Sequence, residues 1–352
     1  MPVVSDFMSI ASTLGRFSSN PLNDSFLQAI GEDFGLTPSE LIGTVNIEEL
    51  LTLAACDVAW ESAKGANERD MESLPRAVGA LSTMSSLQYL IAGVLFELQR
   101  EAIVQRESLH DQLFATMAEG DVVISYNYDL IADSALQKAG LSTSANYQVV
   151  FEKSVKGADF GGATLIDYCA EQAGPVDLLK LHGSLNWLQL KHEEANPLAE
   201  SQFSKHPVFF LADAFSVNVP PSAFGWGFSL DHAGSGSNRS VELTPMIVPP
   251  TFDKAEVWRS RGGSLRRLWA AAKAALTAAD RVVVIGHSLS VADYQTRWLF
   301  RAALAANTSR PEIAVVNLLS SDRARLVTFF ESLGRVVPYE TPQDFLVGRT
   351  AA

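Results

Sequence analysis

From residue 121 onward, short runs of β-branched and other apolar residues alternate with helical stretches. The alternation is clearest near the C-terminus. There it predicts helices over 254–279, 291–306 and 321–333 and strands over 281–285, 312–317 and 335–339. Earlier apolar runs cover residues 122–124, 178–181, 208–211 and 246–248. Because such continuous runs are typical of parallel strands buried on both faces, the sequence predicts an α/β fold with a doubly wound, Rossmann-like, mostly parallel sheet.

The first 120 residues have a different hydrophobic pattern, which predicts a mostly helical subdomain inserted near the start of the fold. Residues 20–118 carry helical periodicity, and Asn46 followed by Glu49 is the pattern of a capped helix start. Residues 190–245, apart from the strand at 208–211, predict long loops or a flap. We therefore expect helices over 1–120 and an α/β domain over 121–340, joined as one composite domain.

Charge and cysteine content narrow the classes of protein that this chain can belong to. It has 27 Lys and Arg against 40 Asp and Glu, a net charge of −13, and an acidic surface disfavours general binding of nucleic acid or anionic membranes. The longest apolar run, 89–96, is too short to span a bilayer. The two cysteines, Cys56 and Cys169, cannot form a zinc ribbon, and they fit a reducing cytoplasm.

Polar and small residues follow four of the predicted strands, where ligands bind in open parallel sheets. They are Ser125, Asn127 and Asp129 after the first strand, His182, Gly183 and Ser184 after 178–181, Gly286, His287 and Ser288 after 281–285, and Asn317 after the apolar run 313–316. Four such strand ends on one rim favour a binding site over chance.

The segment from Gly286 to Ser290 is similar to the nucleophile elbow of serine hydrolases. However, the last position is Ser290 rather than glycine, and no histidine follows Ser288 to complete a triad. We therefore interpret the segment as a glycine turn before a helix, where free N–H groups and the Ser288 hydroxyl hold a phosphate or ribose oxygen.

In this order the motifs resemble the sirtuin-like NAD-consuming domains, and most closely the bacterial branch found in anti-phage defence. The resemblance covers roughly residues 120–320. It rests on Asn127-x-Asp129, Lys180-Leu-His182-Gly183-Ser184, Trp187, Val248-Pro249-Pro250, Gly286-His-Ser288-Leu289 with Asp293, and Val316-Asn317.

The resemblance implies a role for each matching residue. His182 would be the catalytic histidine, and Asn127 would position the nicotinamide ribose or the attacking water. Asp129 would hold the carboxamide end of NAD. The remaining cofactor-binding positions would be Ser125, Gly183, Gly286 and Ser288, the last two at the phosphates or adenosine ribose, and Asn317 near the adenine ribose. No metal ligand is implied.

The residues also have ordinary structural interpretations, which the sequence leaves open. His182 could be a satisfied histidine at a strand end, and Asn127 with Asp129 could form an Asx turn that caps the next helix. Asn317 could be a plain turn residue. Packing accounts for Trp187 more simply than ligand stacking does.

The sequence departs from the family pattern in two respects. The zinc ribbon of protein-deacylating sirtuins is absent, which favours hydrolysis over deacylation. The Gly-Ala-Gly-x-Ser loop that opens the family's domain is also absent, and Met1-Pro2 leading to Asp6-Phe7 looks like the segment that normally follows it. We therefore expect the chain to start one strand late, or the gene to have decayed.

The leading functional prediction is an NAD⁺ hydrolase that releases nicotinamide and ADP-ribose, acting in anti-phage defence. The alternatives are a non-catalytic module that binds NAD or ADP-ribose and an NAD-dependent deacylase. The expected partners are NAD and either a second copy or a defence-system subunit, with no nucleic acid and no membrane.

Overall fold

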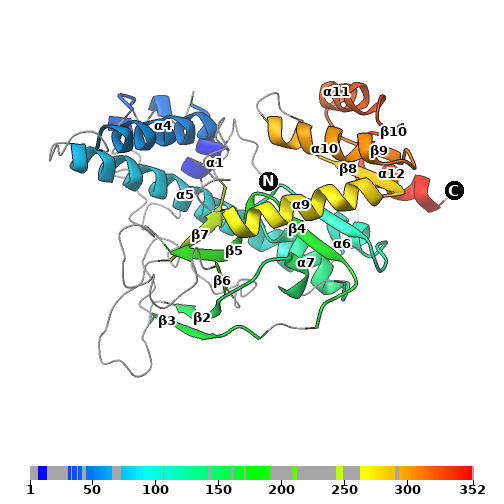
Figure 1. Cartoon of the computed structure of the whole chain (residues 1–352), viewed down its shortest axis with the longest axis horizontal. Coiled ribbons are helices and arrows are strands. Elements are labelled where there is room, and N and C mark those ends of the chain that lie inside the picture. Colours follow the sequence, from blue (N-terminus) through cyan, green and yellow to red (C-terminus); the bar gives the residue numbers. More distant parts are fainter. Residues whose placement is uncertain are drawn as a thin grey trace.

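The computed structural model describes most of the chain and assigns it an α/β architecture (Figure 1). The described residues are 7–13, 31–32, 34–37, 39–41, 45–65, 73–105, 107–141, 144–159, 162–169, 172–190, 208–211, 243–248, 262–289 and 293–350. The predicted loops within 190–245 lie mostly outside these ranges.

The described residues of the N-terminal region are mostly helical. Its helices are α1 (Phe7–Thr13), α4 (Ile47–Gly65), α5 (Ser73–Val104) and α6 (Leu109–Phe114). Figure 1 shows α4 and α5 side by side. At the start of α4, the Asn46 side chain accepts a hydrogen bond from the Glu48 N–H. The predicted N-cap is therefore present, and its side-chain hydrogen bond goes to the second residue after Asn46 rather than to Glu49, the third, as a capping box requires.

Two small sheets are wholly parallel. One pairs β1 (Val122–Ser125) with β4 (Asp177–Lys180), and the other has the order β10-β9-β8 (Arg335–Tyr339, Glu312–Val316, Arg281–Ile285). Helices α9 (Gly262–Ala278), α10 (Tyr294–Ala306), α11 (Ser320–Phe330) and α12 (Pro342–Thr350) alternate with or follow the C-terminal strands. The predicted strands at 281–285 and 335–339 are confirmed to the residue.

A third sheet was not predicted. Its order is β3-β2-β6-β5-β7, formed by Gly162–Asp167, Lys153–Asp159, Val208–Leu211, Gly183–Leu190 and Leu243–Ile247. Only β2 and β6 are parallel; the other three pairs are antiparallel. The prediction of a parallel strand at 246–248 is therefore wrong, because β7 runs antiparallel to β5. The apolar run shows only that β7 is buried on both faces, not its direction.

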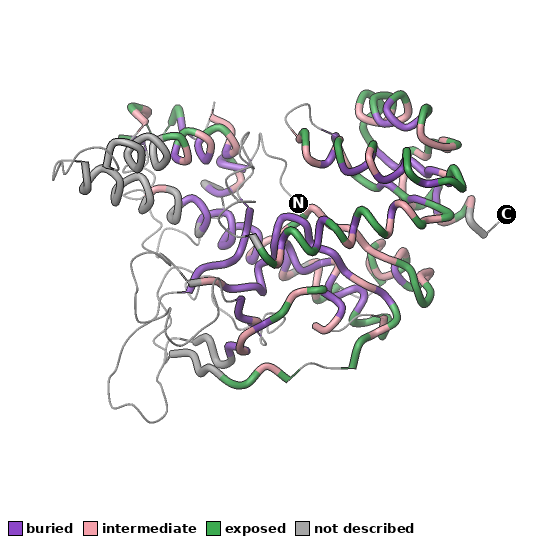
Figure 2. The backbone as a smooth tube through the Cα atoms, viewed as in Figure 1, coloured by how far each residue is buried: buried purple, intermediate pink, exposed green. Residues whose placement is uncertain are grey.

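The helical region and the strands share their cores. One hydrophobic cluster joins α1, α4 and α5 to the five-stranded sheet through side chains such as Leu185, Leu188 and Phe209. The other joins β1, β4, β8 and β9 to the C-terminal helices and reaches the same sheet at Trp187. Figure 2 shows this buried backbone running through the middle of the molecule. The five-stranded sheet therefore lies between the two clusters and links them.

The strands that precede the predicted site residues, β1, β4, β8 and β9, are divided between two sheets. Within the part of the chain that the structure describes, β1 pairs with β4 alone and β8 pairs with β9 alone. Both sheets nevertheless contribute to one hydrophobic cluster. The residues that follow β1, β4, β8 and β9 are close enough to be joined by the hydrogen bonds and ring contacts described below.

Candidate functional site

The loops after β1 and β4 are tied together by backbone hydrogen bonds. The Leu181 N–H donates to the Ser125 carbonyl at 2.9 Å, and the Leu185 N–H donates to the Tyr128 carbonyl at 3.0 Å. Asn127 and His182 both lie between these two ties. The segment with the predicted catalytic asparagine is therefore held against the segment with the predicted catalytic histidine.

His182 is buried in a cluster of aromatic rings. Its ring centroid lies 5.3 Å from that of Tyr126, 6.3 Å from that of Tyr128 and 6.4 Å from that of Trp269. Its backbone carbonyl accepts a hydrogen bond from the Val248 N–H at 2.7 Å. The surrounding rings fix the imidazole at the end of β4, and they leave only 8% of the residue exposed.

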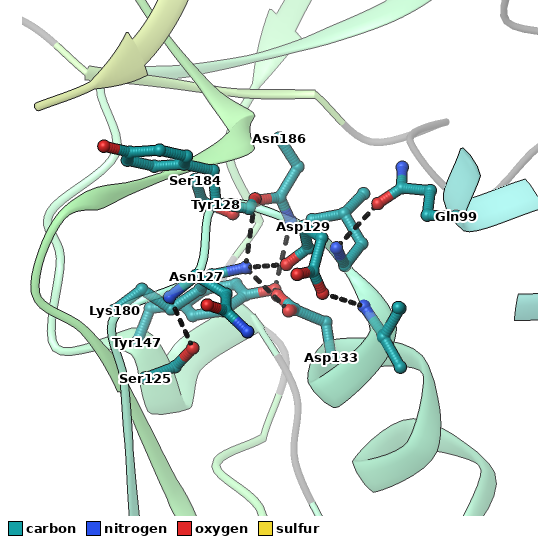
Figure 3. A network of polar contacts seen from close by, with 12 residues as sticks. Gln99, Ser125, Asn127, Tyr128, Asp129, Asp133, Tyr147, Lys180, Ser184 and Asn186 are labelled. Atoms are coloured by element: carbon teal, nitrogen blue, oxygen red, sulfur yellow. Dashed lines mark hydrogen bonds and ion pairs between the residues drawn. The ribbon is translucent and has the colours of Figure 1, made fainter. Parts of the chain in front are cut away.

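Asn127, in contrast, is exposed. Its backbone N–H donates to the Ser125 hydroxyl oxygen at 3.2 Å, so Ser125 shapes the turn that presents it (Figure 3). Among the described residues, no hydrogen bond engages the Asn127 side-chain amide. This amide can therefore orient a water molecule or a ribose hydroxyl through a directed hydrogen bond.

Asp129 is buried and has a structural partner. One carboxylate oxygen accepts the Ile131 N–H at 3.0 Å, at the start of α7 (Ile131–Lys138). This is the Asx-turn geometry that the sequence left open. A role in holding the nicotinamide carboxamide stays a prediction.

Gly183 is required by packing, whatever its part in cofactor binding. Its φ is +89°, and a Cβ atom at this position would lie 2.0 Å from the Met246 carbonyl oxygen. The glycine therefore allows β5 to begin directly against the backbone of β7.

The loop after β8 reaches the same aromatic cluster. His287 and Tyr126 have ring centroids 5.0 Å apart, so Tyr126 contacts both His287 and His182. Gly286 has a φ of +64° with open space around it. Ser288 is exposed, and its carbonyl accepts hydrogen bonds from the Arg325 guanidinium.

Asn317 joins the β9 end to the same loop. Its amide nitrogen donates to the His287 carbonyl at 2.9 Å, and its amide oxygen accepts the Leu319 N–H at 3.0 Å. The side chain therefore braces two strand-end loops, which is the turn role that the sequence left open. Contact with an adenine ribose stays a prediction.

The aromatic residues that join the site were not predicted from the sequence. Burial raises the pKa of the Tyr126 and Tyr128 hydroxyls above that of ordinary tyrosine, and the Tyr128 hydroxyl donates to the Val248 carbonyl. Both tyrosines flank Asn127 in the Ser-Tyr-Asn-Tyr-Asp segment. This alternation of aromatic and polar residues after a strand was the available signal.

Comparisons with known proteins do not identify the chain. No family model matches it, and no curated protein is significantly similar to it. The sirtuin-like resemblance therefore rests on the motifs alone.

Neither a metal cluster nor a membrane-spanning helix occurs in the described part of the chain. In those ranges, no group of three or more His, Cys, Asp or Glu side chains could hold a metal ion. Over the same residues, none of the helices combines the length and apolar character needed to cross a bilayer.

Proposed function

We propose that this chain binds NAD⁺ through a Rossmann-like, sirtuin-like domain over residues 121–340 and hydrolyses it to nicotinamide and ADP-ribose. One observation carries the proposal: Tyr126 contacts the His182 ring on one side and the His287 ring on the other. The end of β4 and the loop after β8, about 100 residues apart in the sequence, thereby meet beside Asn127. An elongated ligand such as a dinucleotide would lie along such a row of strand ends.

The available side chains suit cleavage of the bond between nicotinamide and ribose. Positive charge develops on the sugar as this bond breaks, and nicotinamide leaves as a neutral pyridine that needs no acid. The reaction therefore benefits from positioning and from a base that acts on a hydroxyl or on water. His182 would supply the base, since histidine titrates near neutral pH, and the exposed Asn127 amide would orient the nucleophile.

Gly286 and Ser288 provide the other half of the proposed site. Gly286 has open space where a side chain would stand. The missing side chain would let a phosphate group come close to the backbone. The exposed Ser288 hydroxyl adds a donor beside it. We assign the pyrophosphate or adenosine ribose to this loop.

A second candidate is a module that binds NAD or ADP-ribose without cleaving it. This candidate is favoured because the side chains of Asp129 and Asn317 already form hydrogen bonds with backbone groups of the protein. A site with fewer available polar groups can still bind the ligand while lacking the contacts that a reaction needs.

Nicotinamide release separates the two candidates. We expect the full chain to release nicotinamide from NAD⁺, and Asn127→Ala and His182→Ala to abolish release while each variant stays folded. His110→Ala is the matched control, because His110 is exposed on α6, and it should retain the wild-type rate. The binding module would be established instead if ADP-ribose stabilised the protein and neither wild type nor any variant released nicotinamide. The expected stabilisation is about 2.7 kcal/mol at an ADP-ribose concentration of one hundred times Kd.

The cellular role is proposed on analogy alone. The resemblance implies a cytoplasmic effector that depletes NAD during phage infection, acting as a homo-oligomer or with a defence-system partner. Survival of infected cells that express wild type or His182→Ala tests this role.

A further inference from the structure

A buried ion pair between Lys180 and Asp133 lies beside the segment that holds Asn127, Tyr128 and Asp129 (Figure 3). The Lys180 ammonium at the end of β4 is 2.8 Å from a carboxylate oxygen of Asp133 on α7, and the two side chains are 0% and 1% exposed. The same ammonium donates to the backbone carbonyl of Asp129 and, at 3.5 Å, to that of Tyr128. All three of its N–H groups thus have acceptors.

Hydrogen bonds extend from this pair to the segment that follows His182. Asp133 accepts the hydroxyl of Tyr147, in the short 3-10 helix η2 (Ser144–Tyr147), at 2.5 Å. The Asn186 amide donates to the Tyr147 oxygen at 3.0 Å, and the Ser184 hydroxyl donates to the Asn186 oxygen at 2.6 Å. One continuous network therefore connects the backbone beside Asn127 with the strand that begins one residue after His182.

Burying the Lys180–Asp133 ion pair costs free energy, so the pair is best explained by something that apolar residues could not provide. Removing two charges from water carries a large desolvation penalty, and apolar residues of similar volume often support a fold equally well. What apolar side chains cannot do is hold two backbone carbonyls of an irregular loop at fixed positions. The directed contacts of Lys180 with residues 128 and 129 are of that kind.

We propose that Lys180 and Asp133 are positioning residues that set the placement of Asn127 relative to His182 for cleavage of the nicotinamide–ribose bond. The proposal rests on the proposed function. Lys180 holds the loop through the carbonyls of Tyr128 and Asp129, and Asp133 passes the constraint to Ser184 through Tyr147 and Asn186. Neither residue contacts the substrate.

The test replaces both charges together, because a single replacement would leave the other charge buried without its partner. The variant Lys180→Met/Asp133→Leu keeps apolar volume at both positions. The matched control is Lys153→Met/Asp167→Leu, which removes the exposed ion pair of the β2–β3 hairpin by the same substitutions. Full-length proteins are compared for urea midpoint, for Kd of ADP-ribose, and for kcat and KM with NAD⁺.

We expect the buried double variant to lose about 100-fold in kcat, the cost of misplacing a reacting group by about 1 Å. Its KM and its affinity for ADP-ribose should stay within about threefold of wild type, because uniform binding is unchanged. The control should keep all four values. A kcat within threefold of wild type, or equal losses in kcat and ADP-ribose affinity, would overturn the positioning role.

Hydrogen exchange gives a readout that needs no turnover. In the buried double variant, the amides of residues 127–130 should exchange at least tenfold faster than in wild type at an equal urea midpoint. If the wild type binds ADP-ribose but releases no nicotinamide, the hydrolase is refuted, but the hydrogen-exchange measurement still tests the positioning role. Unchanged exchange at residues 127–130 would then overturn the positioning role independently.

Discussion

Replacing Gly183 by alanine tests how closely the start of β5 packs against β7. The added Cβ would lie 2.0 Å from the Met246 carbonyl oxygen and 2.9 Å from its carbon, both backbone atoms that cannot rotate away. Relief requires β5 and β7 to separate at the register pairs Gly183–Ile247 and Ser184–Met246. The loss of about two hydrogen bonds costs about 2 kcal/mol, and a side chain at φ +89° adds about 1–2 kcal/mol.

Gly183→Ala is therefore expected to lower the free energy of unfolding by about 3–4 kcal/mol. Gly120 provides a matched control, because its φ is +90° and nothing lies within 4 Å of the place that a Cβ atom would take. Gly120→Ala should cost only the conformational part, about 1–2 kcal/mol.

Urea titrations followed by tryptophan fluorescence, to which the buried Trp187 and Trp269 contribute, measure both variants. The difference between them isolates the close approach to Met246 from the unfavourable φ. Equal losses in the two variants would refute the packing argument. Nicotinamide release, measured at a temperature where Gly183→Ala is folded, should also fall, since Gly183 directly follows His182.

Two further predictions concern stability. Burial raises the pKa of the Tyr126, Tyr128 and Tyr147 hydroxyls above the ordinary value of 10.0, so their contribution to stability is complete below pH 10 and is lost as the pH rises toward the folded-state pKa values. The slope should reach about 1.4 kcal/mol per pH unit for each tyrosine, and urea midpoints that stay constant between pH 9 and pH 11 would contradict it. Ser108→Ala removes the capping box with Asp111 at the start of α6 and should lower the unfolding free energy by about 1 kcal/mol, measured by the same titration at pH 7.

The C-terminal strands could be predicted from the sequence because their environment leaves a local signature. Strands β8, β9 and β10 are short, rich in valine and isoleucine, and separated by helices of ordinary length. That pattern specifies the strands and the parallel connection between them. It does not specify which other strands they pair with, because pairing depends on contacts distant in sequence.

The five-stranded sheet shows where local pattern failed. Strand β5 carries alternating polar and apolar residues, but its first residues follow β4 so closely that the sequence indicates a loop there. Ser184 and Asn186 are fully buried polar residues on this strand. Ser184 donates to Asn186, and Asn186 donates to Tyr147, which lies 39 positions earlier. Their burial follows from hydrogen bonds that no local pattern reveals.

The members of the candidate site could be proposed from the sequence, but their surroundings could not. A rule about strand ends was enough to select Asn127, His182 and Asn317. The same rule gives no account of Tyr126, which contacts two histidines from different strands, or of Lys180, whose charge is completely buried. Both depend on tertiary packing that brings separate loops to one place.

The exposure of each polar side chain bears on how substitutions in the site should be interpreted. Asn127 and Ser288 face solvent and can meet a ligand directly, whereas Asp129 and Asn317 hold backbone groups inside the protein. Loss of activity in Asn317→Ala would follow from release of the loop that contains His287, with or without a ligand contact. Only substitutions at the exposed positions, made in a protein of unchanged stability, report on recognition and chemistry, so Asn127 tests an NAD hydrolase more directly than any buried member of the motif.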